Sequence, residues 1–489
     1  MPLWLKEFWP LIFLLLVVAL VFYRLPSVDV GHSKAYLRRR VMNWLPLGLT
    51  YAFLYMGRYN LKVSQYAFEE MAGPGGDPLM GNAGFNTIFM VGTIIYGISF
   101  LINGPLTDRM GGRFSMLTGT LGALVMNVLM GLSSLSLLHH GPFSEFLAAH
   151  FIAVFSVLYA ANMYFQSFGA VAIVKVNAPW FHVRERGVFG AIFGILISLG
   201  VYFAFDLGHM ILDGMGLVWV FFMPALLLSI FWLLDFFMVR NHPSEAGLED
   251  FNTGDATSGD EGPRLGAVVV FKKMLTNPII LTIAGVEFCS GFLRQAIMQQ
   301  YTSFAKQTDA ILGLKSAFVY DNWGLLLCIA GITGGVFAGT ISDHLFQSRR
   351  GPVAGFLYGV MLVGSIGLIF LYTSPIVGWL VVFMSMAVIG VHGMLSGTAS
   401  MDFGGSKNAG IAVGIIDGFV YLGTGVMALT YRNVLPKVQL DAAGHITGPA
   451  TDPANWKAWP LAMVPVAAIG FALALRLWNA KPKPKTKTA

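Results

Sequence analysis

Apolar stretches of about 20 residues recur along the whole chain, and a helix of that length crosses a lipid bilayer. Twelve of them follow residue 40, near 41–66, 84–106, 114–137, 146–178, 188–211, 217–239, 278–306, 319–342, 352–373, 376–401, 408–432 and 457–478. Charged residues make up only 11% of the 489 positions, which is too few to cover a water-facing surface. The pattern therefore predicts an all-α membrane protein.

A further apolar run covers about 3–24 at the start of the chain. Its basic region has one lysine, Lys6, and no cleavage site with small residues follows, which disfavours a cleaved signal peptide. We expect residues 1–30 to form an extra membrane helix. A helix that lies in the bilayer interface is the alternative.

Lysine and arginine residues are concentrated in alternate loops, which is how membrane proteins mark their cytoplasmic side. The series begins with Arg38, Arg39 and Arg40, and it ends with the tail 479–489, which contains KPKPKTKT. This distribution predicts a solvated tail and a cytoplasmic C-terminus. It also accounts for the net charge of +6, so we expect a lipid bilayer and no nucleic acid as the partner.

Two pairs of residues indicate an internal duplication. Arg294 follows Arg58 at almost the same offset at which Asp343 follows Asp108, and the members of each pair lie in corresponding segments. We therefore predict two similar six-helix bundles, each contributing one residue of each pair. Parallel repeats of this kind place a substrate site at the interface between the bundles, near the middle of the membrane.

The predicted bundles can be assigned to the sequence. They cover residues 41–239 and 277–478, with a polar, glycine-rich linker at 240–276 that we expect on the cytoplasmic side.

Arg58 and Arg294 are the residues most indicative of function. An arginine inside the bilayer costs several kcal/mol, so it usually faces a cavity or a ligand. Two guanidinium groups at matching repeat positions suit a phosphate or a carboxylate, because each presents a rigid fork of donors. The alternative is a structural ion pair with a neighbouring acid, for instance Glu287.

Other polar residues near these arginines are candidates for the same site. Lys62 follows Arg58 by one helical turn and shares its face, although its side chain could instead extend toward the membrane surface. Gln295 and Gln299 could bond the hydroxyl groups of a sugar. Tyr59 also neighbours Arg58, although tyrosines in membrane helices are more often packing residues.

No pattern in the sequence predicts an enzyme. There is no Walker A loop, so ATP does not drive the protein directly. No cluster of His, Cys and carboxylates has metal-ligand spacing, and Cys289 and Cys328 both lie in apolar segments. We expect no cofactor and no metal site, and transport that depends on solute gradients.

The loop after the second of the twelve segments carries a distinctive motif. Gly104-x-Leu106-x-Asp108-Arg109-x-Gly111-Gly112-Arg113 is partly repeated around Asp343 after the eighth segment. It resembles the signature of the major facilitator superfamily. We expect Asp108, Arg109, Arg113 and Asp343 to control the conformation of the halves; the alternative is that they only mark the membrane boundary.

Five further stretches carry a closer resemblance. They are Tyr55-Met-Gly-Arg58-Tyr-Asn60, Phe292-Leu-Arg294, Trp180-Phe-His-Val-Arg184-Glu185-Arg186-Gly187, Ser342-Asp343-His-Leu-Phe-Gln-Ser-Arg349-Arg350-Gly351 and Lys407-Asn-Ala-Gly410 through Tyr421-Leu-Gly423. Together they resemble the organophosphate:phosphate antiporters, the family of glycerol-3-phosphate and hexose-6-phosphate transporters, over about 40–480.

The resemblance implies exchange of a small organic phosphate for inorganic phosphate by alternating access. Arg58 and Arg294 match the paired phosphate-binding arginines of the family, and we expect a monomer in a bacterial inner membrane. Two departures are Phe100, where the family usually has a lysine, and Pro179, where it often has a histidine. Lys62 could restore the missing positive charge.

Two other functions remain compatible with the sequence. A membrane sensor for a phosphorylated sugar would keep the same arginines. A proton-coupled carrier of organic anions would also use them, with buried acids to bind the proton.

Overall fold

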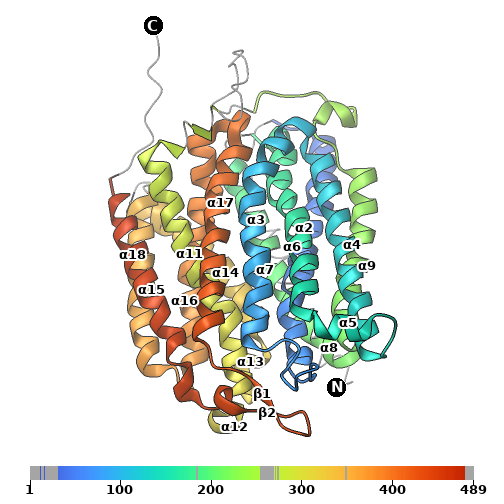
Figure 1. Ribbon diagram of the computed structural model, residues 1–489. Coiled ribbons are helices and arrows are strands. Elements are labelled where there is room, and N and C mark those ends of the chain that lie inside the picture. The colour runs from blue at the N-terminus through green and yellow to red at the C-terminus, as the bar shows by residue number, and fades with distance from the viewer. Residues whose placement is uncertain are drawn as a thin grey trace.

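The computed structural model describes residues 31–182, 185–253, 275–346 and 350–479, with isolated positions outside these ranges. Twelve long helical segments within them run side by side (Figure 1). They are α2 (Lys34–Phe68), α3 (Asn82–Met110), α4 (Gly112–Leu138), α6 (Phe151–Asn177), α7 (Arg186–Tyr202), α9 (Leu217–Met238), α11 (Pro278–Gln307), α14 (Trp323–Leu345), α15 (Arg350–Leu371), α16 (Val377–His392), α17 (Ser400–Val434) and α18 (Ala458–Arg476). Each coincides with one of the apolar segments of the sequence.

Shorter elements connect or extend these helices. Two π-helical turns, η3 (Phe203–Leu207) and η6 (Gly393–Ala399), continue α7 and α16, and α8 (Gly208–Met215) completes the first of them. The connecting helices are α5 (Ser144–Ala149), α12 (Asp309–Leu312), α13 (Phe318–Asp321), η1 (Ala178–Trp180), η4 (Pro243–Ala246), η5 (Leu314–Ser316), η7 (Gly448–Thr451) and η8 (Pro453–Trp456). A small antiparallel hairpin pairs β1 (Gln439–Leu440) with β2 (Ile446–Thr447), placing Gln439 opposite Thr447.

Ten of the described helical segments are long and apolar enough to cross a membrane, and α14 contains a shorter apolar stretch, Trp323–Ala338. Helix α2 does not meet this composition because it carries several polar and charged side chains. Most of these, including Arg58, Asn60 and Lys62, are buried inside the protein. The first helix is therefore polar because it lines the interior of the bundle.

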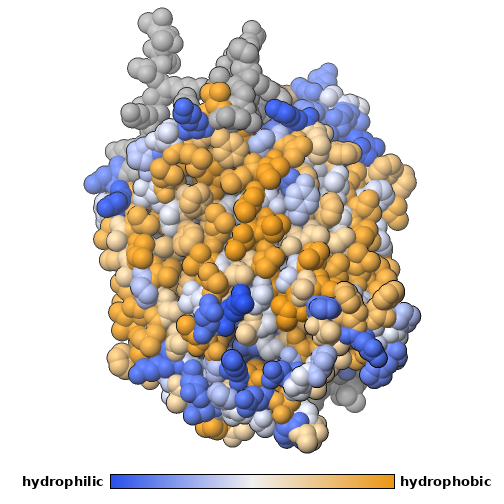
Figure 2. Space-filling view, viewed as in Figure 1, coloured by the Kyte–Doolittle hydropathy of each residue, from blue (hydrophilic) through white to orange (hydrophobic). Residues whose placement is uncertain are grey.

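The face seen in Figure 2 is largely apolar across its middle and more hydrophilic toward its two ends. Large apolar side chains such as Ile98, Leu121, Phe237 and Val363 are exposed on the helices. An exposed apolar belt of this extent indicates a lipid-facing surface.

Two long contacts join the first six helices to the last six. Helix α3 packs along α17, and α7 packs along α14. The first contact depends on small residues: a Cβ added at Gly97 would lie 2.9 Å from the carbonyl oxygen of Gly418. Such close backbone approach is typical of helices packed inside a membrane.

The predicted extra helix, linker and tail lie largely outside the described residues. The extra helix at 1–30 lies there apart from two isolated positions, as do nearly all of the tail 479–489 and the middle of the linker 240–276. The division into bundles at 41–239 and 277–478 stays a prediction.

Candidate substrate site between the two sets of helices

Arg58 lies in the interior of the molecule on α2, with 1% of its surface exposed. Its guanidinium donates to three neutral oxygens: Nε to Gln166 Oε1 at 3.0 Å, Nη2 to Tyr96 Oη at 2.7 Å and Nη1 to Tyr421 Oη at 2.8 Å. The rings of Tyr55 and Tyr96 also lie 4.6 Å from the guanidinium carbon. None of these described partners is a carboxylate, so its positive charge is solvated by dipoles but not neutralised.

Arg294 lies on α11 and is 7% exposed. Its Nε and Nη2 atoms are buried, and neither has a hydrogen-bond partner among the described residues. Buried polar groups are nearly always paired, and a charged donor without a partner carries the full cost of desolvation. Arg294 therefore has free donors for a ligand.

The two arginines share neighbours. Tyr55, Tyr59 and Tyr421 lie close enough to both guanidinium groups to interact with them electrostatically. Because Tyr421 is on α17, the partners of Arg58 come from both sets of six helices. The structure thus brings Arg58 and Arg294 to one region between the two sets.

The predicted glutamines connect to this region. Gln295 Nε2 donates to Tyr59 Oη at 2.8 Å, and Gln299 Nε2 donates to Gln295 Oε1 at 2.9 Å. The side-chain oxygen of Gln299, Oε1, is buried without a partner among the described residues. A chain of neutral donors and acceptors therefore runs beside the arginines.

The structure does not form the ion pair between Arg294 and Glu287 that the sequence left open. Glu287 is fully buried, and its Oε2 lies 2.9 Å from Nδ1 of His392 at the end of α16. The described ion pairs leave both site arginines without a carboxylate.

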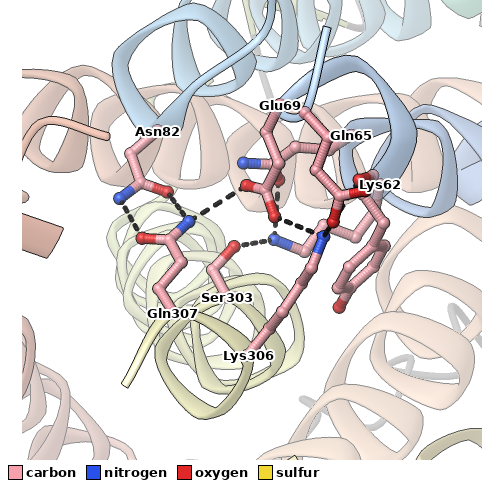
Figure 3. A network of polar contacts seen from close by, with 9 residues as sticks. Lys62, Gln65, Glu69, Asn82, Ser303, Lys306 and Gln307 are labelled. Atoms are coloured by element: carbon pink, nitrogen blue, oxygen red, sulfur yellow. Dashed lines mark hydrogen bonds and ion pairs between the residues drawn. The ribbon is translucent and has the colours of Figure 1, made fainter. Parts of the chain in front are cut away.

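Lys62 belongs to a second polar network, which joins the C-terminal ends of α2 and α11 (Figure 3). Its ammonium donates to Gln65 Oε1 at 2.9 Å and to Ser303 Oγ at 2.5 Å. Lys306 pairs with Glu69 at 2.9 Å and with Glu70 at 2.8 Å. The network therefore links α2 to α11.

Gln307 and Asn82 extend the same network to α3. The two amides bond each other in both directions, at 2.8 and 2.9 Å, and Gln307 Nε2 also donates to Glu69 Oε2 at 3.1 Å. We call the seven residues labelled in Figure 3 the end network: Lys62, Gln65, Glu69, Asn82, Ser303, Lys306 and Gln307.

The residues of the signature loop lie at the opposite end of the helices. Lys175 Nζ, on α6 of the same half, donates to Asp108 Oδ1 at 2.7 Å. Arg113 donates to the carbonyl oxygen of Phe236 at 2.5 Å, and Arg109 is exposed. Asp343 lies on α14, but its side chain is outside the described part of the structure.

Three interacting residues were not assigned these roles from the sequence. Gln166 and Tyr96 hold Arg58, and Asp206 accepts the backbone N–H groups of Gly324 at 2.6 Å and Leu325 at 2.8 Å. The only signal in the sequence was that each is a polar residue in an apolar run. Among the described residues, no group of His, Cys, Asp and Glu is arranged to hold a metal ion.

Comparison with known proteins gives a consistent assignment. The family model described as Major Facilitator Superfamily matches residues 47–428. The glycerol-3-phosphate transporter of Bacillus subtilis is 24% identical over 474 residues, covering 92% of this chain and 95% of the relative. A probable hexose phosphate transport protein of Chlamydia pneumoniae is 24% identical, covering 79% and 81%. The membrane sensor protein UhpC of Escherichia coli is 23% identical, covering 83% and 88%.

Solved structures support the fold. A bacterial homologue of the human lysosomal transporter Spinster, in an inward-facing and unoccupied conformation, has a TM-score of 0.62 at 16% identity and covers 91% of this chain and 98% of its own. A mutant of the nucleoside transporter NupG has a TM-score of 0.58 at 10% identity, covering 91% and 100%.

Proposed function

Since the chain belongs to the Major Facilitator Superfamily, we propose that it is a secondary active antiporter that exchanges a small organic phosphate for inorganic phosphate. The observation that carries this proposal is the pair of buried guanidinium groups, Arg58 and Arg294, which have no carboxylate partner among the described residues. Curated relatives named as glycerol-3-phosphate and hexose phosphate transporters support the choice of a sugar phosphate or glycerol phosphate.

The chemistry of the site favours a phosphate. A guanidinium fork binds two oxygens of one phosphate with parallel, charge-assisted hydrogen bonds. The free Nε and Nη2 of Arg294 provide such a fork on one side. On the other side, phosphate oxygens would replace the two tyrosine hydroxyls that accept hydrogen bonds from Arg58. The amides of Gln295 and Gln299 would then face the sugar or glycerol part, with Tyr59 bonded to Gln295 at one end of the chain.

Electrostatics explains why the carrier would exchange and not release its cargo freely. Two buried cations, neither of which forms an ion pair with a carboxylate among the described residues, repel each other, and a low-dielectric interior strengthens the repulsion. A bound phosphate removes this penalty, so the two halves close around a loaded site more readily than around an empty one. In this mechanism Asp108, Arg109, Arg113 and Asp343 act on the conformational equilibrium, and substrate reaches the site by alternating access.

The protein is a multi-pass membrane protein, and we place it in a bacterial inner membrane as a monomer. We orient the protein with its C-terminus and the end bearing Arg39 and Arg40 facing the cytoplasm. The end network then lies on the outer side.

A second candidate function is sensing. The relative UhpC is named as a membrane sensor protein, so the same fold serves detection in that protein. A sensor would bind phosphate without measurable flux. A proton-coupled carrier of organic anions is the other alternative, and its flux would not need phosphate on the opposite side.

Exchange of radiolabelled phosphate in proteoliposomes tests the proposal, with a panel of sugar phosphates and glycerol phosphate as counter-substrates. We expect exchange by the wild type and its loss in Arg58→Lys and Arg294→Lys, because lysine keeps the charge but not the fork. Arg432→Lys, at an exposed position, is the matched control. Full exchange by both site variants would overturn the proposal, and binding without exchange would favour a sensor.

A further inference from the structure

Three ionisable side chains in the second set of helices have no part in the proposed phosphate contacts. Glu287 on α11 is fully buried, one carboxylate oxygen lies against His392, and the other, Oε1, has no partner among the described residues. Asp417 on α17 accepts a hydrogen bond from the hydroxyl of Ser396. Asp417 precedes Tyr421 by one helical turn, so it adjoins the residue that bonds Arg58.

The charges around Glu287 do not balance without a proton. Helix α16 contributes His392 and α17 contributes Asp417, while α11 itself contributes Arg294 and Cys289. Helix α15 contributes Tyr358, whose hydroxyl is already donated to the carbonyl oxygen of Val286. Helix α18 has no ionisable residue before Arg476, and η6 has none. Two carboxylates therefore face one permanent cation, Arg294, among the described residues.

A histidine beside a buried carboxylate is well suited to hold a proton. The contact of 2.9 Å between Nδ1 of His392 and Oε2 of Glu287 has room for one proton between the two groups. If neither group holds it, a carboxylate is left in the membrane interior without a neutralising partner, which is costly.

We propose that Glu287, His392 and Asp417 form a proton-binding site, and that anion binding at Arg294 draws a proton into it. The coupling rests on the proposed function, because it needs an anion at Arg294. The proton comes from the surrounding water.

The distance between the two sites supports this coupling. Glu287 precedes Arg294 by seven residues, or two turns, which is about 10 Å along the helix. At an effective dielectric constant of about 20, cancelling a unit charge at that distance changes a proton-binding equilibrium on the order of tenfold. A phosphate that neutralises Arg294 removes the positive neighbour that opposes protonation of the pair. By linkage, a proton on the pair strengthens phosphate binding by the same factor.

Proton uptake on ligand binding tests the proposal directly. Inorganic phosphate is added to the purified full-length protein in weakly buffered detergent solution with a pH-indicator dye, and phosphate binding is measured in the same samples. The difference between wild type and Glu287→Gln cancels the protons that phosphate itself exchanges. The measurement is repeated across a range of pH, and at the pH of the largest difference we expect the wild type to take up about half a proton more per bound phosphate than Glu287→Gln, which is the most that a tenfold change in one proton-binding equilibrium produces. An equal uptake by both proteins, with phosphate bound, overturns the proposal.

The matched control is Asp235→Asn. Asp235 is also a buried carboxylate in a membrane helix, but it lies on α9 and accepts from Thr50 on α2. Its substitution is expected to leave proton uptake unchanged. If Glu287→Gln does not fold, His392→Gln replaces it, with the same expected loss.

Infrared difference spectroscopy separates this proposal from the proposed function. If the wild type binds no phosphate, the proposed function fails, and the ligand-free protein still reports on the proton site. A carboxylic acid band that changes with pH, is absent in Glu287→Gln and persists in Asp235→Asn supports the site. Spectra without that difference overturn it.

Discussion

Among the side chains of the site, Gln166 decides whether Arg58 keeps its charge available. It accepts from Arg58 Nε through a neutral amide oxygen, and it is itself positioned by a hydrogen bond to Asn162 Oδ1 at 3.1 Å. A carboxylate of the same shape would be an ion-pair partner at the same place. The neutrality of this one residue is therefore a requirement of the proposed anion site.

Gln166→Glu tests that requirement. We expect the variant to fold, because a buried arginine with a bonded carboxylate is tolerated, but phosphate binding should weaken at least about tenfold because the phosphate must compete with the new carboxylate. Binding and the unfolding temperature of the purified variant are measured together. Wild-type affinity in a folded Gln166→Glu protein would contradict the role given to Arg58.

Lys62 is the second side chain whose role can be measured. It lies one turn beyond Arg58, but its described hydrogen bonds go to Gln65 and Ser303 and not to the arginine site. If it supplies the positive charge that Phe100 does not, Lys62→Gln should weaken phosphate exchange strongly in proteoliposomes. Unchanged exchange would remove Lys62 from the substrate site and leave it as a member of the end network alone.

The sequence predicted the arginines but not the residues that hold them. Arg58 and Arg294 could be identified because a charge within an apolar run is expensive and therefore meaningful. Gln166 and Tyr421 could not, because a neutral polar side chain in a membrane helix is common. Which helices become neighbours is decided by packing across the bundle, and a linear pattern does not contain that information.

The sequence predicted the long helices but not the π-helical turns that interrupt them. All twelve expected segments are helical, because backbone hydrogen bonds in lipid leave few other structures. The π-helical turn Phe203–Leu207 was not expected. It lies beside the contact between α7 and α14, where the Asp206 carboxylate caps the first turn of α14.

That cap links one set of helices to the other. The N-terminus of a helix has unpaired N–H groups and a partial positive charge, and Asp206 satisfies both. Asp206→Ala should therefore loosen α14 at this end, at a cost of about 0.5–2 kcal/mol. Gly324→Ala should act similarly, because its Cβ would lie 2.8 Å from Asp206 Oδ1.

The native Cys328 reports on this change. It is buried on α14 close to Asp206, so opening of the contact should expose it. In a Cys289→Ser background, we expect a membrane-impermeant thiol reagent to label Cys328 several-fold faster in Asp206→Ala than in the parent. Equal labelling rates would show that the cap does not hold this contact closed.

For the molecule as a whole, alternating access requires that the two halves separate at one end while they close at the other. In the proposed mechanism the end network is the contact that must break, because Lys306 on α11 is paired with Glu69 and Glu70 at the end of α2. The buried carboxylate of Glu69, the half-buried Lys306 and a bidentate amide pair make this closure specific and reversible. Its strength should therefore set how often the site opens at that end.

A charge exchange between Lys306 and Glu69 tests this mechanism. Lys306→Glu places a third acid beside Glu69 and Glu70, and like charges at close range cost several kcal/mol, so phosphate exchange should fall at least about tenfold. The double variant Lys306→Glu with Glu69→Lys restores one pair and should recover much of the rate, giving a coupling energy from the cycle.

Lys457→Glu, an exposed change at the same end, is expected to exchange at the wild-type rate. Because Arg58 and Arg294 are untouched, phosphate binding in detergent should survive in every variant, so a loss of exchange without loss of binding would place the defect in closure of the halves. A double variant no faster than Lys306→Glu would show that the ion pair is not what holds this end shut.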